Sequence, residues 1–470
     1  MPDICGSKFF LVNSICLLAI NWASVSVQVG QLLLALSLLI ILHEFGHYIT
    51  ARWFGCRVEK FFLFFDPWFS LVKKKVGETV YGIGWLPLGG YVKISGMIDE
   101  SMDKEAMKQP PKEWEFRSKP AWQRLIIMLG GVLMNVLVAF LIYAFVLMIW
   151  GERRTPMSSL KYGIWTVDSL MTDIGLKNGD KIISINGEPV DYFENLGAQV
   201  ILGNDIIVER EGKQHEIKLP INLVERLIES KRKKGYLLQM RLPTYVGEYK
   251  KNDTLYGKKA GLQGMDKIVA VDSTPVQFYD EISGLLASHR NGEVTLTVDR
   301  NGKLLKLNSK VNAEGRIGIP YLDDEQYQDL GVYKTDIRKY GFFAAFPAGV
   351  AKSIEKLKYY IDQFRLILNP ETGAYKGVGG FKAIGSVFPT EWSWEAFWNI
   401  TAFLSIILAF MNLLPIPALD GGHVMFTLYE MVSGRKPNEK FMEYAQVAGM
   451  ILLLLLMLYA NGNDWFGWGK

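Results

Sequence analysis

The chain has few of the features that mark disulfide-rich, nucleic-acid-binding or disordered proteins. Its 470 residues include only three cysteines, Cys5, Cys16 and Cys56, so the long middle region can form no disulfide of its own. Charged residues make up only 21%, and a net charge of +4 is too small to indicate nucleic acid as a partner. Histidine is also scarce, with five residues in all. Hydrophobic residues reach 49%, which excludes a disordered chain.

Charge is absent altogether from four long apolar runs, at residues 9–42, 125–150, 398–415 and 444–462. About 20 apolar residues are enough for a helix to cross a bilayer. Four such runs predict a polytopic α-helical membrane protein rather than a soluble one with buried helices. We expect transmembrane helices at residues 27–54, 122–150, 396–416 and 443–463. Residues 1–26 are then an apolar lead-in, either a signal-like segment or an interfacial one.

Basic residues near the ends of these runs predict the orientation of the helices. Three follow the first run, four precede the second, and three lie between the third and fourth: Arg52, Arg57, Lys60, Lys112, Arg117, Lys119, Arg124, Arg435, Lys436 and Lys440. Basic residues are concentrated in cytoplasmic loops. Residues 55–121 and 417–442 are therefore expected on the cytoplasmic side, and residues 151–395 on the other.

The region between the second and third runs contains two copies of one pattern. Residues 171–190 and 258–276 share Gly-Leu, Asp-Lys-Ile and a following turn at matching offsets. The pattern resembles the PDZ signature, although Met265 and Asp272 replace its glycine and asparagine in the second copy. We expect PDZ-like α+β domains at residues 155–240 and 241–325, then an amphipathic or linking region at 326–395. The resemblance implies peptide binding by strand addition; the alternative is that both copies only limit access.

The first span contains a sequence with the chemistry of a metal site. His43 and His47 flank Glu44 in His-Glu-Phe-Gly-His, and on a helix the two histidines lie one turn apart on the same face. Their imidazoles can then bind one metal ion while Glu44 handles protons. Ionisable groups inside a span are costly and usually functional.

Catalytic zinc normally has three protein ligands, so a third must come from elsewhere in the chain. Residues 412–422 read Asn-Leu-Leu-Pro-Ile-Pro-Ala-Leu-Asp-Gly-Gly, and the prolines end the third span just before Asp420. Asp420 is the better candidate, but it is also suited to capping a following helix. His423 is a second candidate ligand.

These motifs together resemble the site-2 protease family of intramembrane zinc proteases, most closely its bacterial regulator-of-sigma-E branch, over about residues 27–465. The resemblance implies that His43, His47 and Asp420 bind one catalytic Zn²⁺ and that Glu44 is the general base. It also implies a fold of four transmembrane helices, a membrane-associated β-hairpin or sheet, and two extracytoplasmic PDZ-like α+β domains.

Further family positions imply contacts with substrate. They are Asn412, Asn135 in Gly-Val-Leu-Met-Asn (131–135, with Val132 for the usual proline), and Gly89, Gly90 and Tyr91. The last three lie in residues 79–94, which match a membrane-re-entrant hairpin of the family. An exposed strand edge there can pair with an unwound substrate.

The resemblance implies a zinc metalloendopeptidase of the bacterial inner membrane, with its PDZ-like domains on the periplasmic side. It would cleave single-span membrane proteins, such as a trimmed anti-sigma factor or a remnant signal peptide, in regulated intramembrane proteolysis. The partners are then that substrate, the lipid bilayer and a peptide ligand of the PDZ-like domains, with no nucleic acid. Two alternatives stay open: a quality-control zinc protease acting on soluble or misfolded segments, and a non-catalytic membrane PDZ scaffold.

Overall fold

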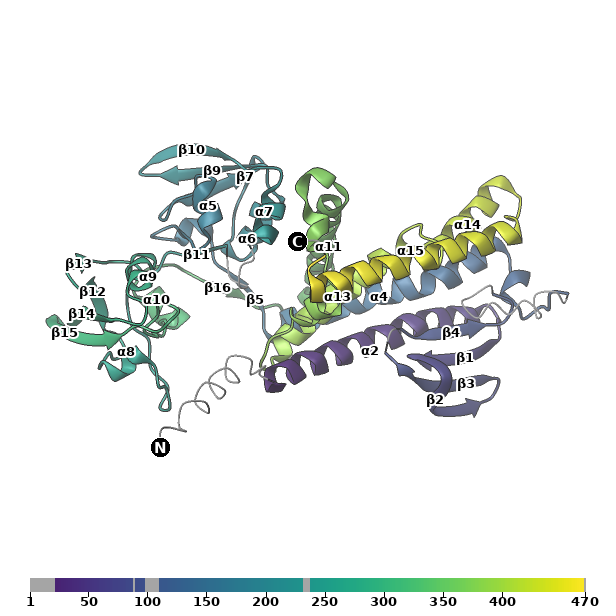
Figure 1. The fold of residues 1–470 in the computed structure, drawn as a ribbon. Coiled ribbons are helices and arrows are strands. Elements are labelled where there is room, and N and C mark those ends of the chain that lie inside the picture. The colour runs from purple at the N-terminus through teal and green to yellow at the C-terminus, as the bar shows by residue number, and fades with distance from the viewer. Residues whose placement is uncertain (1–21, 88, 98–109, 231–236, 469–470) are drawn as a thin grey trace, which may run out of the picture. The chain divides into compact units, whose positions relative to one another are not determined.

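The computed structural model describes residues 22–87, 89–97, 110–230 and 237–468. Most of the expected lead-in, residues 1–21, lies outside the described residues. The chain divides into two compact units (Figure 1). The first comprises the described residues up to Gly151 together with Lys339–Phe364 and those from Gly377 onward. The second comprises Glu152–Arg338 and Arg365–Lys376.

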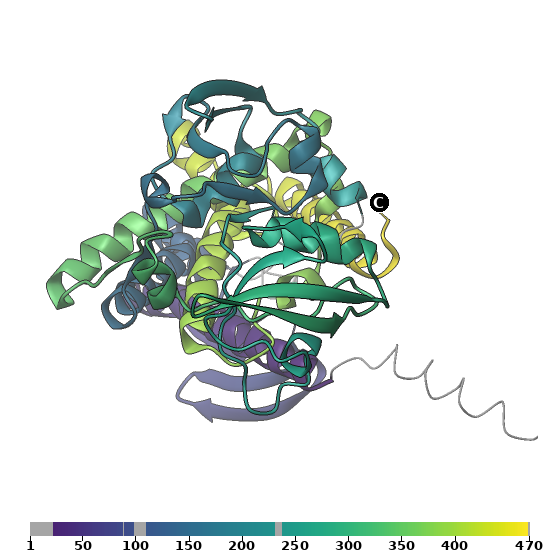
Figure 2. The ribbon, with the colours of Figure 1, turned by 90° about the vertical axis from the view of Figure 1, so that its left-hand side faces the viewer.

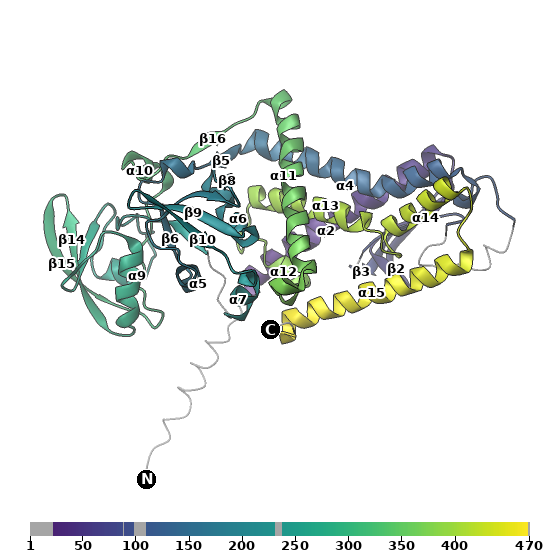
Figure 3. The same cartoon turned by 90° about the horizontal axis from the view of Figure 1, so that it is seen from above.

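The first unit is built around helices. These are α2 (Trp22–Trp53), α4 (Ala121–Ile149), α11 (Phe342–Leu368, whose last turn belongs to the second unit), α12 (Phe381–Gly385), α13 (Trp394–Leu413), α14 (Asp420–Ser433) and α15 (Glu439–Phe466). Helix α4 is central, because α2, α13 and α14 all pack against it (Figure 3). Among the described residues, α2, α4, α13 and α15 are long and apolar enough to cross a membrane, as the uncharged runs predicted.

The helix ends differ from the expected ones where local sequence decides them. Helix α2 already includes Trp22, the first described residue and five residues before the expected start, because residues 22–26 are uncharged and continue the helix. Helix α13 ends at Leu413 instead of 416, since the backbone of Leu414 is extended immediately before Pro415. Helices α2 and α4 cross closely at two glycines: a β-carbon on Gly130 would lie 2.6 Å from the carbonyl oxygen of Gly46.

Residues after α2 form a four-stranded sheet in the first unit. The strands are β1 (Val58–Leu63), β2 (Phe65–Val76), β3 (Thr79–Leu86) and β4 (Tyr91–Ile94), in the order β2-β3-β1-β4. The two runs of residues 79–94 therefore do not pair with each other as the expected hairpin would, but both belong to the same sheet. Strand β1 lies between β3 and β4, parallel to β3 and antiparallel to β4. The segment around Pro87 and Gly89 carries the chain across β1, so β4 becomes an edge strand beside α2.

The second unit contains two copies of one sheet (Figure 2). Their orders are β10-β9-β7-β8 and β15-β14-β12-β13, and each has a bulge at the same place in its central strand. The strands are β5 (Glu152–Arg154), β6 (Ile164–Thr166), β7 (Lys181–Ile185), β8 (Glu188–Pro189), β9 (Asp205–Arg210), β10 (Lys213–Lys218), β11 (Leu238–Met240), β12 (Lys267–Val271), β13 (Thr274–Pro275), β14 (Glu293–Arg300), β15 (Lys303–Lys310) and β16 (Asp336–Arg338). The helices are α5 (Ser169–Asp173), α6 (Leu196–Leu202), α7 (Leu223–Glu229), α8 (Tyr256–Lys259), α9 (Tyr279–Ser288) and α10 (Asp324–Asp329).

The same buried ion pair stabilises each copy. Arg210 donates to both carboxylate oxygens of Asp180 at 2.7 Å, and Arg300 does the same to Asp266. Both carboxylates are almost fully buried, so each guanidinium compensates a charge that would otherwise be costly. The repeat inferred from the turn motif therefore extends to the packing of the strands.

The second copy is inserted into the first. After the second copy, the chain returns and places Tyr327, Val332 and Tyr333 in the core of the first copy, and β16 pairs with β5. The two ends of the inserted copy meet where the Gly247 amide donates to the Pro320 carbonyl at 2.8 Å. The expectation that residues 326–395 only link the two parts is thus corrected. The first part of this region completes the first copy, because its apolar side chains are buried in that core.

Candidate metal centre and active site

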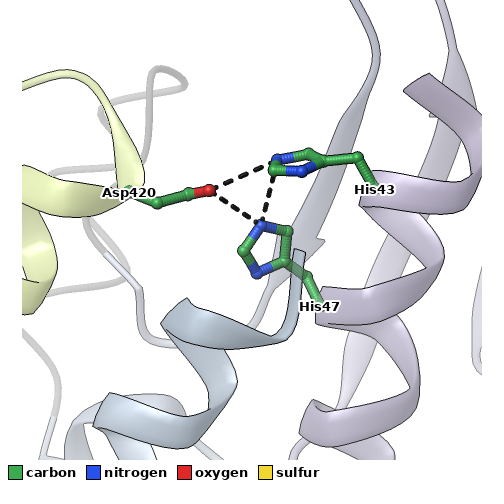
Figure 4. Close-up of side chains that lie close together, drawn as sticks. All are labelled: His43, His47 and Asp420. Carbon is green, nitrogen blue, oxygen red and sulfur yellow. Dashed lines mark hydrogen bonds and ion pairs between the residues drawn. The ribbon is translucent and has the colours of Figure 1, made fainter. Parts of the chain in front are cut away.

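Three potential metal ligands converge in the first unit. His43 and His47 project from α2, and Asp420 is the first residue of α14 (Figure 4). The two Nε2 atoms lie 3.3 Å apart, and each lies 3.3 Å from Oδ2 of Asp420. All three residues are largely buried. The three atoms therefore form a nearly equilateral triangle.

This triangle has the dimensions that tetrahedral zinc requires. Zn–N and Zn–O bonds of about 2.0–2.1 Å at tetrahedral angles separate neighbouring ligand atoms by roughly 3.3 Å. Within the described residues, the buried Oδ2 of Asp420 has no hydrogen-bond partner, although two imidazole nitrogens face it. A cation at the centre would satisfy all three atoms. Two histidines and one carboxylate also leave the fourth position open, as catalytic sites need.

The break between α13 and α14 aims Asp420 at the histidines. Two features make it tight: Ala418 has a left-handed backbone with φ 78°, and a β-carbon on Gly422 would lie 2.7 Å from Cα of Pro417. Leu419 occupies the N-cap position and makes no side-chain cap. Asp420 therefore lies inside the first turn of the helix and reaches the histidines, so the structure does not assign it the alternative capping role.

A stripe on α4 orients both imidazoles. The Nδ1–H of His47 donates to the Ile127 carbonyl at 2.9 Å, which leaves its Nε2 lone pair directed at the triangle. One turn further along α4, Gly131 has no side chain and so leaves space for the two imidazole rings. After another turn, Asn135 places its amide nitrogen 3.1 Å from Nδ1 of His43. Sequence reasoning missed Ile127, because a backbone carbonyl leaves no signal in the residue type.

The ligands open onto a cavity of about 540 Å³ lined by Glu44, Gly90, Tyr91 and His423. Glu44 is thus next to the triangle without belonging to it. Gly90 lies against α2, since a β-carbon there would lie 2.6 Å from Cγ2 of Ile40 and 3.3 Å from Cγ of Glu44. The Tyr91 hydroxyl donates to Asp66 at 2.8 Å.

The other residues expected at the site differ in whether they line the cavity. The amide nitrogen of Asn412 lies 3.3 Å from Nε2 of His43, although Asn412 is absent from the cavity lining. Asn135 is fully buried and is absent from the cavity lining. Gly89, with φ 151°, is also outside the lining and permits the turn into β4. His423 lines the cavity, but it is not in the three-residue cluster found among the described residues.

Comparison with known proteins agrees with this geometry. Residues 31–456 match the model of peptidase family M50. The chain is 28% identical over 451 residues to a Vibrio cholerae protein named "Putative zinc metalloprotease", which covers 92% of this chain and 97% of the relative. It is 27% identical over 472 residues to the "Regulator of sigma E protease" of Salmonella typhi, covering 95% and 99%. This chain therefore belongs to peptidase family M50, the site-2 protease family, and is a zinc metalloprotease.

Proposed function

We propose that this protein cleaves single-span membrane proteins within or near the bilayer, with one zinc ion held by His43, His47 and Asp420. The proposal rests on one observation, the position of the three ligands relative to the candidate membrane-spanning helices. Two of them project from α2, a helix long and apolar enough to cross a membrane, and the third follows α13, which has the same property. Peptide-bond chemistry at this site would act at membrane depth.

The chain's own residues supply the rest of the chemistry. A zinc ion held by the triangle contributes Lewis acidity, which polarises the scissile carbonyl. Glu44 lines the same cavity and acts as the general base: it takes a proton from the attacking water and delivers it to the leaving amine. The Asn412 amide, whose nitrogen lies 3.3 Å from Nε2 of His43, would donate to the developing oxyanion.

Strand β4 provides a way to hold an unwound substrate. A helical substrate hides its peptide bonds in its own hydrogen bonds, so it must be extended before attack. Strand β4 is an edge strand, and Gly90 and all four of its residues line the cavity beside Glu44. An extended segment added to this edge would keep its backbone hydrogen bonds and lie against the ligands. Gly90 and Tyr91 then contact the substrate.

The proposed setting is the bacterial inner membrane, with both copies of the second unit, as PDZ-like domains, on the periplasmic side. The relatives that are named regulators of sigma E protease support regulated intramembrane proteolysis, with a trimmed anti-sigma factor or a remnant signal peptide as substrate. The PDZ-like domains would hinder substrates that carry bulky external domains.

Glu44→Gln in the purified protein tests this function. With a single-span reporter in liposomes, the variant should lose cleavage while it keeps stoichiometric zinc, because Glu44 is not a ligand. Glu78→Gln is the control, since Glu78 is exposed in its pair with Arg52 and lies outside the cavity. Undiminished cleavage by Glu44→Gln would refute the role. Equal cleavage of an unfolded soluble protein would favour the quality-control alternative.

A further inference from the structure

Asn135 is placed to serve the metal site without touching the substrate. Its side chain is fully buried, and its amide nitrogen lies 3.1 Å from Nδ1 of His43. Its backbone carbonyl accepts a hydrogen bond from the hydroxyl of Ser405 at 2.8 Å, and Ser405 is fully buried in α13. Helices α4 and α13 therefore hold Asn135 behind the imidazole, on the side away from Asp420.

The other imidazole shows what a zinc ligand needs from its second nitrogen. A neutral imidazole has one hydrogen and one lone pair. When Nε2 binds a metal, Nδ1 carries the hydrogen and needs an acceptor. His47 has that acceptor in the carbonyl oxygen of Ile127. On the same stripe of α4, two turns further, the group that faces Nδ1 of His43 is the Asn135 amide.

The orientation of this amide decides which nitrogen of His43 has a lone pair available for a metal ion. An amide N–H that donates to Nδ1 requires the hydrogen to be on Nε2, and that tautomer cannot bind a metal. The Oδ1 atom of Asn135 is meanwhile buried and has no hydrogen-bond partner within the described residues. A half-turn about the Cβ–Cγ bond exchanges the two ends of the amide, which are nearly equal in size. Oδ1 then faces Nδ1–H.

We infer that Asn135 is a positioning residue whose Oδ1 accepts the Nδ1–H of His43 and so keeps the Nε2 lone pair directed at the metal. This inference rests on the proposed zinc site. It replaces the expected substrate contact at Asn135, because the side chain is buried and does not line the cavity. When the hydrogen of His43 is on Nε2 instead, the amide N–H of Asn135 can donate to Nδ1. Asn135 can therefore hold the imidazole in either tautomer.

The test is the zinc affinity of two nearly isosteric variants, measured by chelator competition on the full-length protein in detergent. Asn135→Leu removes the acceptor and should weaken zinc binding by about 10- to 100-fold, as loss of such partners does. Asn135→Asp keeps an acceptor and should retain the wild-type affinity. Asn463→Leu is the matched control, because Asn463 is a buried asparagine of α15 that donates to Val378, outside the site. Its affinity should be unchanged.

Wild-type affinity in Asn135→Leu would overturn the inference, as would an equal loss in Asn135→Asp. A raised KM with unchanged zinc affinity would assign Asn135 to substrate binding instead. If Asn135→Leu does not fold, nitrogen-15 NMR of histidine in the zinc-loaded protein still decides. The Nδ1–H resonance of His43 should move downfield in Asn135→Asp, and an unmoved resonance refutes the contact. Failure of the proposed zinc site is distinguishable, since wild-type protein would then bind no zinc.

Discussion

A β-carbon on Gly131 would lie 2.6 Å from Cε1 of His43, so α4 can pass beneath this imidazole only with glycine at position 131. The same β-carbon would also overlap Nε2 of His47. Glycine is unfavourable in helices, by about 1 kcal/mol relative to alanine. Its presence in the middle of a candidate membrane span therefore has a reason: it makes room for both proposed zinc ligands.

Gly131→Ala should consequently separate helix stability from function. Alanine favours the helix, yet its methyl group must displace one or both imidazoles, so zinc content and proteolysis should both fall sharply. Elemental analysis of the purified protein and a reporter cleavage assay measure these losses. Gly30→Ala is the matched control, since a β-carbon on Gly30 in α2 meets no atom within 4 Å. A Gly131→Ala protein with normal zinc and activity would contradict the described packing.

The identity of the third ligand is tested by paired substitutions. Asp420→Ala should deplete zinc as severely as His47→Ala, because a site with only two protein ligands binds poorly. His423→Ala should keep its zinc, since His423 lies in the cavity wall outside the triangle. Zinc analysis after dialysis against a weak chelator gives the comparison. Depletion in His423→Ala alone would make His423 the third ligand.

Met265 gives a prediction about stability. It has φ 66° where the first copy has Gly179 with φ 94°, so a long side chain occupies a left-handed position that favours glycine. Met265→Gly should stabilise the second copy by about 1 kcal/mol, because left-handed backbone costs roughly 1–2 kcal/mol for a residue with a β-carbon. Hydrogen exchange of the β12 and β14 amides measures it. Met265→Ala keeps the strain and should show no gain.

The role of the inserted copy is tested by removing it. Deleting residues 155–322, which lie within the two expected PDZ-like domains, would leave Tyr327 and Val332 without their core. Excision of residues 248–319 instead joins Gly247 to Pro320, which already share a hydrogen bond. If this copy excludes bulky substrates, the shortened protein should cleave untrimmed substrate faster and trimmed substrate at the wild-type rate. Slower cleavage of the trimmed form would indicate that the copy grips a peptide.

The sequence by itself determined those features that depend only on residues close together in the chain. Uncharged runs predict four membrane-length helices, because the cost of burying charge is local to each run. The spacing of His43 and His47 follows from helical periodicity alone. The repeat could be recognised because turn residues such as those near Asn186 and Asp272 need the same left-handed backbone in both copies.

Only the tertiary structure decided what depends on segments far apart in the chain. It placed Asp420, rather than His423, within 3.3 Å of both imidazoles. It inserted β1 between β3 and β4, and returned the chain to the first copy after the second. It also turned Asn135 toward His43 and away from the cavity. These outcomes follow from the packing of helices and strands against one another, and that packing is not encoded in any single stretch of residues.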